Sequence, residues 1–140
     1  MANTLHVEVV SSNAHIFSGE AEFIVLPGEE SQLGIYPRHA PLLTKIRPGE
    51  VRIRIAGQEK EELIFVAGGM LEVQPFEVTV LADSAIRSED ADEARAMQEK
   101  QAAEGLMKEK LSSFQFAKAE SELALALMQL QYFKRMKGRG

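Results

Sequence analysis

The side chains most able to do chemistry are few and scattered along the chain. His6, His15 and His39 lack the spacing of a metal-binding helix motif, and there is no cysteine to complete a zinc site. Serine, histidine and aspartate all occur, but without the GxSxG sequence that exposes the nucleophilic serine of many hydrolases. The sequence therefore predicts neither a metal site nor a catalytic triad.

Two adjacent acids, Glu29 and Glu30, stand between Gly28 and Gly34. A phosphate-binding loop needs a lysine after its second glycine and backbone amides that meet no acid, so this loop would repel phosphate. The pair is also weak as a general acid and base, because consecutive carboxylates on a hairpin loop are normally solvated. The remaining interpretation is a polar loop that docks on another protein.

Four cations and no acid lie in the last eight residues, namely Lys134, Arg135, Lys137 and Arg139. Cations at the C-terminal end of a helix complement the helix dipole, which is a sufficient structural explanation. The functional alternative is docking on an acidic protein surface, since clustered positive charge steers association. The whole chain has a net charge of −5, so general binding of nucleic acid is not expected.

The elements that must position these residues divide the chain near residue 86. All five prolines and seven of the ten glycines lie in the first 75 residues. Residues 1–86 carry six basic and twelve acidic side chains, whereas residues 87–140 carry ten and nine. We expect one domain over residues 1–86 and a differently built second one over residues 87–140.

Alternating apolar residues in the first part predict half-buried strands. The alternation is seen in Leu5, Val7 and Val9, in Ala21, Phe23 and Val25, in Val51, Ile53 and Ile55, and in Val78 and Val80. Pairs of turn-forming residues separate the runs, at Ser18–Gly19, Pro27–Gly28, Pro48–Gly49, Ala56–Gly57 and Gly68–Gly69. This spacing leaves no room for crossover helices and favours an antiparallel β-sandwich or flattened barrel.

The second part has the pattern of two helices. Asp90 is a predicted N-cap, with Glu93 three residues later and acids that favour the positive end of the dipole. The first helix is predicted to reach about Leu111 and the second to begin at about Gln115, each about 33 Å long. The second carries apolar residues at steps of three and four, namely Phe116, Ala119, Leu123, Ala126, Leu127, Leu130 and Phe133.

Nine alanines between residues 89 and 131 keep the predicted helices slender. Small side chains let two antiparallel helices approach closely, but they leave a free-standing pair little apolar area to bury. The fold class is therefore predicted as α+β, a β-sandwich followed by a two-helix antiparallel hairpin that needs a second surface. Similar buried areas against the sandwich and against another protein would make the hairpin a switch.

A long, ordered set of motifs resembles the epsilon subunits of bacterial F-type ATP synthases. Residues 27–44 read PGEESQLGIYPRHAPLLT, and FVAGGMLEV (65–73), VTVLAD (78–83) and DEARA (92–96) follow in the same order. The chain departs from the family at three positions where glycine is common, which here hold Ser31, Arg38 and Phe76. Gln32 stands where related sequences often carry an acid.

The resemblance implies a non-catalytic subunit that binds the gamma subunit and rests on the c-subunit ring as part of the central stalk. Catalysis would lie in the beta subunits. Candidate partner-binding residues on the sandwich are Glu29, Glu30, Gln32, Arg38, His39, Ala40, Pro41 and Leu42. The implied location is peripheral, at the cytoplasmic face of the bacterial inner membrane, and no stretch approaches the ~20 apolar residues of a membrane span.

The resemblance also implies that the C-terminal helices move between a folded hairpin and an extended form that enters the head of alpha and beta subunits and restrains ATP hydrolysis. Lys134, Arg135 and Lys137 are the candidates for docking there. No cofactor is required, although some family members bind ATP through a motif that Asp92 and Arg95 partly retain. The structural alternative is an ordinary Asp–Arg pair on a helix surface.

Overall fold

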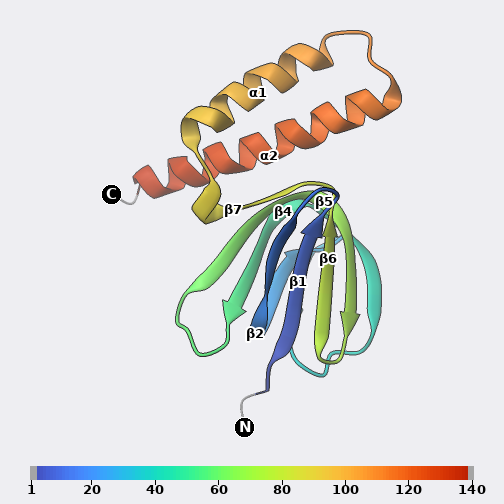
Figure 1. Cartoon of the computed structure of the whole chain (residues 1–140), viewed down its shortest axis with the longest axis vertical. Helices are drawn as coiled ribbons and strands as arrows, with labels where there is room; N and C mark the ends of the chain where they lie inside the picture. The colour runs from blue at the N-terminus through green and yellow to red at the C-terminus, as the bar shows by residue number, and fades with distance from the viewer. Residues whose placement is uncertain (1–2, 139–140) are drawn as a thin grey trace.

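The computed structural model describes residues 3–138 and consists of a strand-built part and a helical hairpin (Figure 1). The strands are β1 (Leu5–Ser11), β2 (His15–Pro27), β3 (Gln32–Ile35), β4 (Leu42–Ile55), β5 (Glu61–Gln74), β6 (Glu77–Ala82) and β7 (Ala85–Arg87). A short 3-10 helix, η1 (Ser88–Asp90), leads to the helices α1 (Glu93–Met107) and α2 (Ser113–Gly138). The predicted fold class, a β-sandwich followed by a helical hairpin, is confirmed.

The sheet closes on itself. Its order is β1-β6-β5-β4-β2, and β1 also pairs with β2, while β3 and β7 attach to β2 and β5. Closure leaves few free strand edges, which protects the sandwich from edge-to-edge association. Six of the seven strand pairings are antiparallel as predicted, but β1 and β6 run parallel. The sequence pattern missed this pairing because it joins the first strand to the sixth and involves no local turn.

Alternation identifies the core correctly in β1, but in β2 only as far as Ala21. Leu5, Val7 and Val9 are fully buried, as expected. In β2 the register against β4 shifts between Ala21 and Phe23. An irregularity of this kind moves the following side chains to the opposite face. The buried residues are therefore Ile24 and Leu26 instead of Phe23 and Val25.

Three of the five predicted turns lie inside long strands. Ser18–Gly19 is in β2, Pro48–Gly49 in β4 and Gly68–Gly69 in β5. Gly68 and Gly69 adopt φ values of 105° and 148°, a region that other residues rarely occupy. These glycines interrupt the regular pairing between β4 and β5 without ending either strand.

The cap of α1 differs from the predicted one, and α2 begins at Ser113, slightly before the predicted Gln115. The side chain of Asp92, not Asp90, accepts a hydrogen bond from the Arg95 amide and caps α1. At α2 the Ser112 hydroxyl accepts from the Gln115 amide while the Gln115 side chain accepts from the Ser112 amide, a capping box. The helices span about 22 Å and 39 Å, because α1 is shorter and α2 longer than predicted.

The hairpin is held together by small side chains. Its buried apolar residues are all alanines, namely Ala96, Ala103, Ala119 and Ala126. Within the predicted stripe on α2, Phe116 and Leu127 stay exposed. The helices thus pack closely while burying little apolar area. Within residues 3–138, no helix is both long enough and apolar enough to cross a membrane.

Candidate partner-binding surfaces

The acidic loop between β2 and β3 lies beside β4 at Ile46. Glu29, Glu30 and Gln32 are exposed, while Gly28 beneath them is buried. Gly28 forms a bridge with Ile46, and the Arg47 side chain donates to the Gly28 carbonyl oxygen over 2.7 Å. A Cβ atom at position 28 would lie 2.5 Å from the Ser31 carbonyl oxygen, so glycine is needed here. The backbone therefore presents these three polar side chains to solvent.

The second predicted segment, from Arg38 to Leu42, lies beside the β5–β6 turn. The Arg38 amide donates to the Pro75 carbonyl oxygen over 2.6 Å, and Arg38 has a φ of 71°. This left-handed backbone is a conformation that glycine adopts more readily than arginine. His39 bonds through Nδ1 to the Ala40 carbonyl oxygen at 2.7 Å. Ala40 and Pro41 are exposed, and Leu42 is half-buried at the start of β4.

The structure does not bring these two segments together. Leu42 begins β4 opposite Val73, whereas Ile46, which pairs with Gly28, lies four residues further along the same strand. At the rise of an extended chain this separation is about 13 Å. The sandwich therefore presents two candidate contact surfaces at different places.

A third surface was not identified from the sequence. Val10, Leu81 and Met70 are successive neighbours across β1, β6 and β5, and Lys45 of β4 follows Met70. We call Val10, Leu81 and Met70 the outer row, because they lie on the face of the sheet away from the core. Leu81 is 52% exposed. Their apolar side chains at outward positions were the available sequence signal, since outward residues are normally polar.

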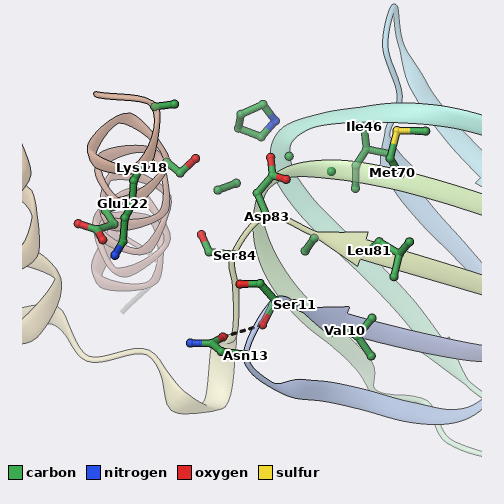
Figure 2. Close-up of a pocket in the computed structure, with 18 of the residues that line it drawn as sticks. Val10, Ser11, Asn13, Ile46, Met70, Leu81, Asp83, Ser84, Lys118 and Glu122 are labelled. Carbon is green, nitrogen blue, oxygen red and sulfur yellow. Dashed lines mark hydrogen bonds between the residues drawn. The ribbon is translucent and has the colours of Figure 1, made fainter. Parts of the chain in front are cut away.

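The outer row lines an open groove between the sandwich and α2, with a volume of about 1200 Å³. Figure 2 shows Lys118 and Glu122 on α2 opposite Asp83 and Ser84. Phe114 also lines the groove and is 79% exposed. The first part of α2 is thus separated from the sheet by a groove with an apolar floor and charged rims.

The basic C-terminal residues have partners within the folded chain. Arg135 pairs with Glu50 of β4, and Lys137 pairs with Glu93 of α1 at 2.7 Å. Lys134 is exposed and forms no ion pair with any residue between 3 and 138. Arg139 lies outside the described residues. Arg135 thus joins α2 to the sandwich, whereas Lys137 joins the two helices of the hairpin to each other.

Asp92 and Arg95 form a helix cap instead of a side-chain ion pair. The Asp92 carboxylate accepts from the Arg95 amide over 2.9 Å. The Arg95 guanidinium donates to the Asp90 carbonyl oxygen over 2.9 Å and lies 3.5 Å from the Glu99 carboxylate. Neither Asp92 nor Arg95 lines the groove between the sandwich and α2. Asp92 and Arg95, the residues retained from the ATP motif, thus lie at the N-terminal end of α1.

Two histidines and two glutamates form a cluster across β1 and β2 that the sequence did not reveal. The Glu8 carboxylate lies 2.6 Å from His6 Nε2 and 2.5 Å from His15 Nε2, and His6 Nδ1 lies 2.8 Å from Glu20. Hydrogen bonds from His6 and Ser18 lower the pKa of Glu8 to about 2. Those with Glu8 and Glu20 raise the pKa of His6. Between residues 3 and 138 no histidine or acidic cluster has the arrangement of a metal site.

Solved structures share this fold at low sequence identity. A chain of the Euglena gracilis mitochondrial ATP synthase (OSCP/F1/c-ring in rotational state 1) aligns with a TM-score of 0.70 and 14% identity, covering 94% of this chain and 82% of that one. A chain of the Tetrahymena thermophila mitochondrial ATP synthase (central stalk/c-ring) aligns with a TM-score of 0.60 and 15% identity, covering 90% and 96%. At these identities the likeness shows a common fold.

Sequence comparison shows the family. The model described as ATP synthase, Delta/Epsilon chain, beta-sandwich domain matches residues 4–88, and that of the long alpha-helix domain matches residues 89–134. ATP synthase epsilon chains of Herminiimonas arsenicoxydans and Janthinobacterium sp. (strain Marseille) are 57% and 56% identical over 137 residues, with 98% of each chain covered. The resemblance seen in the motifs is confirmed, and the chain belongs to the ATP synthase delta/epsilon chain family, among its bacterial epsilon chains.

Proposed function

We propose that the chain is a non-catalytic subunit of the central stalk of a proton-translocating F-type ATP synthase. It couples the rotor to the catalytic head, and its C-terminal helices restrain ATP hydrolysis. The observation that carries this role is the contrast between the two parts. A closed sandwich with a continuous apolar core supports a hairpin whose own buried residues are alanines. Such a hairpin can leave the sandwich without unfolding it.

The sandwich offers separate surfaces for two partners. The outer row and its groove present apolar area with charged rims, the composition of a lasting protein interface, and this surface is assigned to the gamma subunit. The exposed polar loop with Glu29, Glu30 and Gln32 is assigned to the c-subunit ring. The segment from Arg38 to Leu42 extends the contact surface at the β5–β6 turn. The subunit would then be peripheral, on the cytoplasmic face of the bacterial inner membrane.

The regulatory role is tested by ATP hydrolysis in an ATPase complex depleted of its epsilon subunit. Hydrolysis is measured before and after adding the full chain or a chain that ends after Asp90, which keeps every strand. We expect the full chain to lower the rate severalfold and the truncated chain to bind but inhibit much less. Lys134, Arg135 and Lys137 would contact the alpha and beta subunits in the inhibited state. Neutralising Lys134, which has no ion pair in the folded chain between residues 3 and 138, should therefore weaken inhibition.

Binding is followed separately by co-sedimentation with the complex. Equal inhibition by both chains would contradict a regulatory role for the helices. Confirmed binding without inhibition by either chain would leave the coupling role alone.

ATP as a regulatory ligand is a second candidate. The Arg95 guanidinium is half exposed beside the start of α1, where a phosphate would meet a positive charge. Because the Asp92 carboxylate already caps the helix, ATP would have to replace that hydrogen bond. Calorimetric titration with ATP checks this directly. Heat of binding that is lost in Arg95→Gln but kept in Lys100→Gln would support the site, and an absence of heat in the native chain would exclude it.

A further inference from the structure

Phe65 is buried by the hairpin and not by the sandwich. Its neighbours on β5, Ile64 and Val66, belong to the apolar core, and alternate residues of a strand face opposite sides. Phe65 is nevertheless 0% exposed. Its ring meets that of Tyr132 on α2 edge to face, with centroids 5.4 Å apart. In Figure 1, α2 lies between α1 and the strands, so Phe65 stays dry only while α2 is docked.

An ion pair lies directly beside this aromatic contact. Glu50 is the cross-strand neighbour of Phe65, and its carboxylate binds Arg135, which follows Tyr132 by three residues. Residues three apart share one face of a helix. The Glu50 side chain is 21% exposed and the Arg135 side chain 46%, so solvent screens the carboxylate less than the guanidinium. Phe65 and Glu50, which are neighbours in the sheet, thus contact residues on successive turns of α2.

One turn before Tyr132 the same face carries a polar side chain that does not fit its surroundings. Gln129 is 1% exposed, and its amide nitrogen donates to the Leu125 carbonyl oxygen over 3.3 Å. Its side-chain oxygen has no hydrogen-bond partner. A buried, unpaired carbonyl oxygen opposes burial, because it has lost its bonds to water. Gln129 therefore weakens the docking that Tyr132 and Arg135 strengthen.

We propose that Gln129, Tyr132 and Arg135 form a reversible clasp that sets the balance between a docked and a released hairpin. The contacts that hold α2 to the sheet are concentrated in its last three turns, since further back the groove separates the two. Opening one aromatic contact and one ion pair frees the hairpin, and Gln129 keeps this opening easy. The clasp deepens the proposed regulatory role, on which its biological meaning rests.

The balance can be measured in the full chain by itself. Because the sequence contains no cysteine, Glu59→Cys and Glu109→Cys supply the only two labelling sites, one on the sandwich and one between the helices. Pulsed electron paramagnetic resonance between spin labels then gives the fractions of short (docked) and long (released) distances. Arg135→Gln removes the ion pair, and Lys134→Gln is the matched control. We expect the ratio of released to docked hairpin to rise about fivefold in the first, and to stay unchanged in the second.

Gln129→Leu tests the opposing contribution at similar side-chain volume. In the Arg135→Gln background it should lower the ratio of released to docked hairpin about tenfold, by removing the unpaired oxygen. The exchange of charges in Glu50→Arg with Arg135→Glu should restore docking that either substitution alone weakens. Circular dichroism of each variant confirms that both helices are kept.

Equal shifts in Arg135→Gln and Lys134→Gln would overturn the clasp, as would a rise in the released fraction in Gln129→Leu. These distances involve no partner subunit, so they are independent of the hydrolysis assay. A clasp that responds as expected while hydrolysis is unaffected would reject the proposed regulation and keep the clasp. Inhibition of hydrolysis by a chain whose distances do not respond to these substitutions would reject the clasp and keep the proposed regulation.

Discussion

At the scale of single residues, the Glu8 carboxyl has a strongly lowered pKa. Its pKa lies near 2, below the ordinary 4.5, because His6 and Ser18 donate to it. The ionised Glu8 carboxylate therefore stabilises the folded chain, and this contribution is complete above pH 4.5 and is lost as the pH falls toward 2. The raised pKa of His6 acts in the other direction. Its contribution is complete below the ordinary 6.5 and is lost as the pH rises through the raised value.

His6→Gln should therefore destabilise the chain most between about pH 4.5 and 6.5, where both contributions are present. Since these side chains are exposed, we expect a loss of only about 2 °C in melting temperature at pH 5.5, and almost none at pH 9. Thermal unfolding followed by circular dichroism across this range provides the check, with His39→Gln as control. A deficit that is the same at every pH would show that the ring contributes by packing alone.

At the scale of elements, the conformation of β5 and its pairing with β6 depend on Gly69. A Cβ atom at Gly69 would lie 2.1 Å from the Leu81 carbonyl oxygen, and the φ of 148° already disfavours any side chain. The atoms that this Cβ would meet, the Leu81 carbonyl oxygen and Ala82 Cα, belong to the backbone of β6. They cannot move away without disturbing the pairing of β5 with β6. Gly57 also has a positive φ, of 77°, but has open space around it.

Gly69→Ala should lower the free energy of unfolding by about 3–5 kcal/mol, since it adds a collision to backbone strain. Gly57→Ala should cost about 1 kcal/mol, from strain alone. Urea unfolding of both variants measures the difference. Similar losses of stability in the two variants would mean that β5 can move away from β6. The continuous pairing of these strands argues against such a movement.

The elements were predicted where a local pattern determines them and missed where a distant contact does. Alternation placed Leu5, Val7 and Val9 in the core, because the pairing of β1 with β2 stays regular as far as Val9. It failed at Phe23, since the register shift depends on pairing with β4. Pro48–Gly49 has the composition of a turn, yet β4 continues through it, because β5 pairs with both of its halves.

The contact surfaces show the same limit. The motif resemblance indicated the loops at Glu29 and Arg38, but only the fold shows that β4 separates them. The outer row and the Phe65–Tyr132 contact join residues far apart in the sequence, so no local pattern reveals them. One signal was present: residues 64–68 read IFVAG without a polar side chain, and such a continuous run indicates a strand segment covered on both faces.

At the scale of the whole molecule, β7 joins the two parts and belongs to the sandwich. Arg87 donates to Glu62 over 2.6 Å, pairs with Glu89 at 3.1 Å and lies over the Phe17 ring. Its hydrogen bond with Glu62 raises the pKa of Arg87 further above its already high value. The last strand of the sandwich therefore ends at Arg87, whose side chain contributes to the packing of the strands.

A chain that ends after Ile86 should be less stable than one that ends after Asp90, because it lacks Arg87 and leaves the half-buried Glu62 carboxylate unpaired. We expect a difference of about 1–2 kcal/mol in the free energy of unfolding. Both truncated chains expose Phe65, so that loss cancels in the comparison. Urea unfolding of the two gives the value, and equal midpoints would place the end of the sandwich before Arg87.

The parallel pairing of β1 with β6 also orders events during synthesis. The first strand waits, with one of its two edges open, until residues 77–82 have been made and have left the ribosome. Only then does the barrel close, while α2 has still to leave the ribosome. The nascent sandwich is thus finished with Phe65 uncovered, and α2, the last element to emerge, meets a surface that is already built.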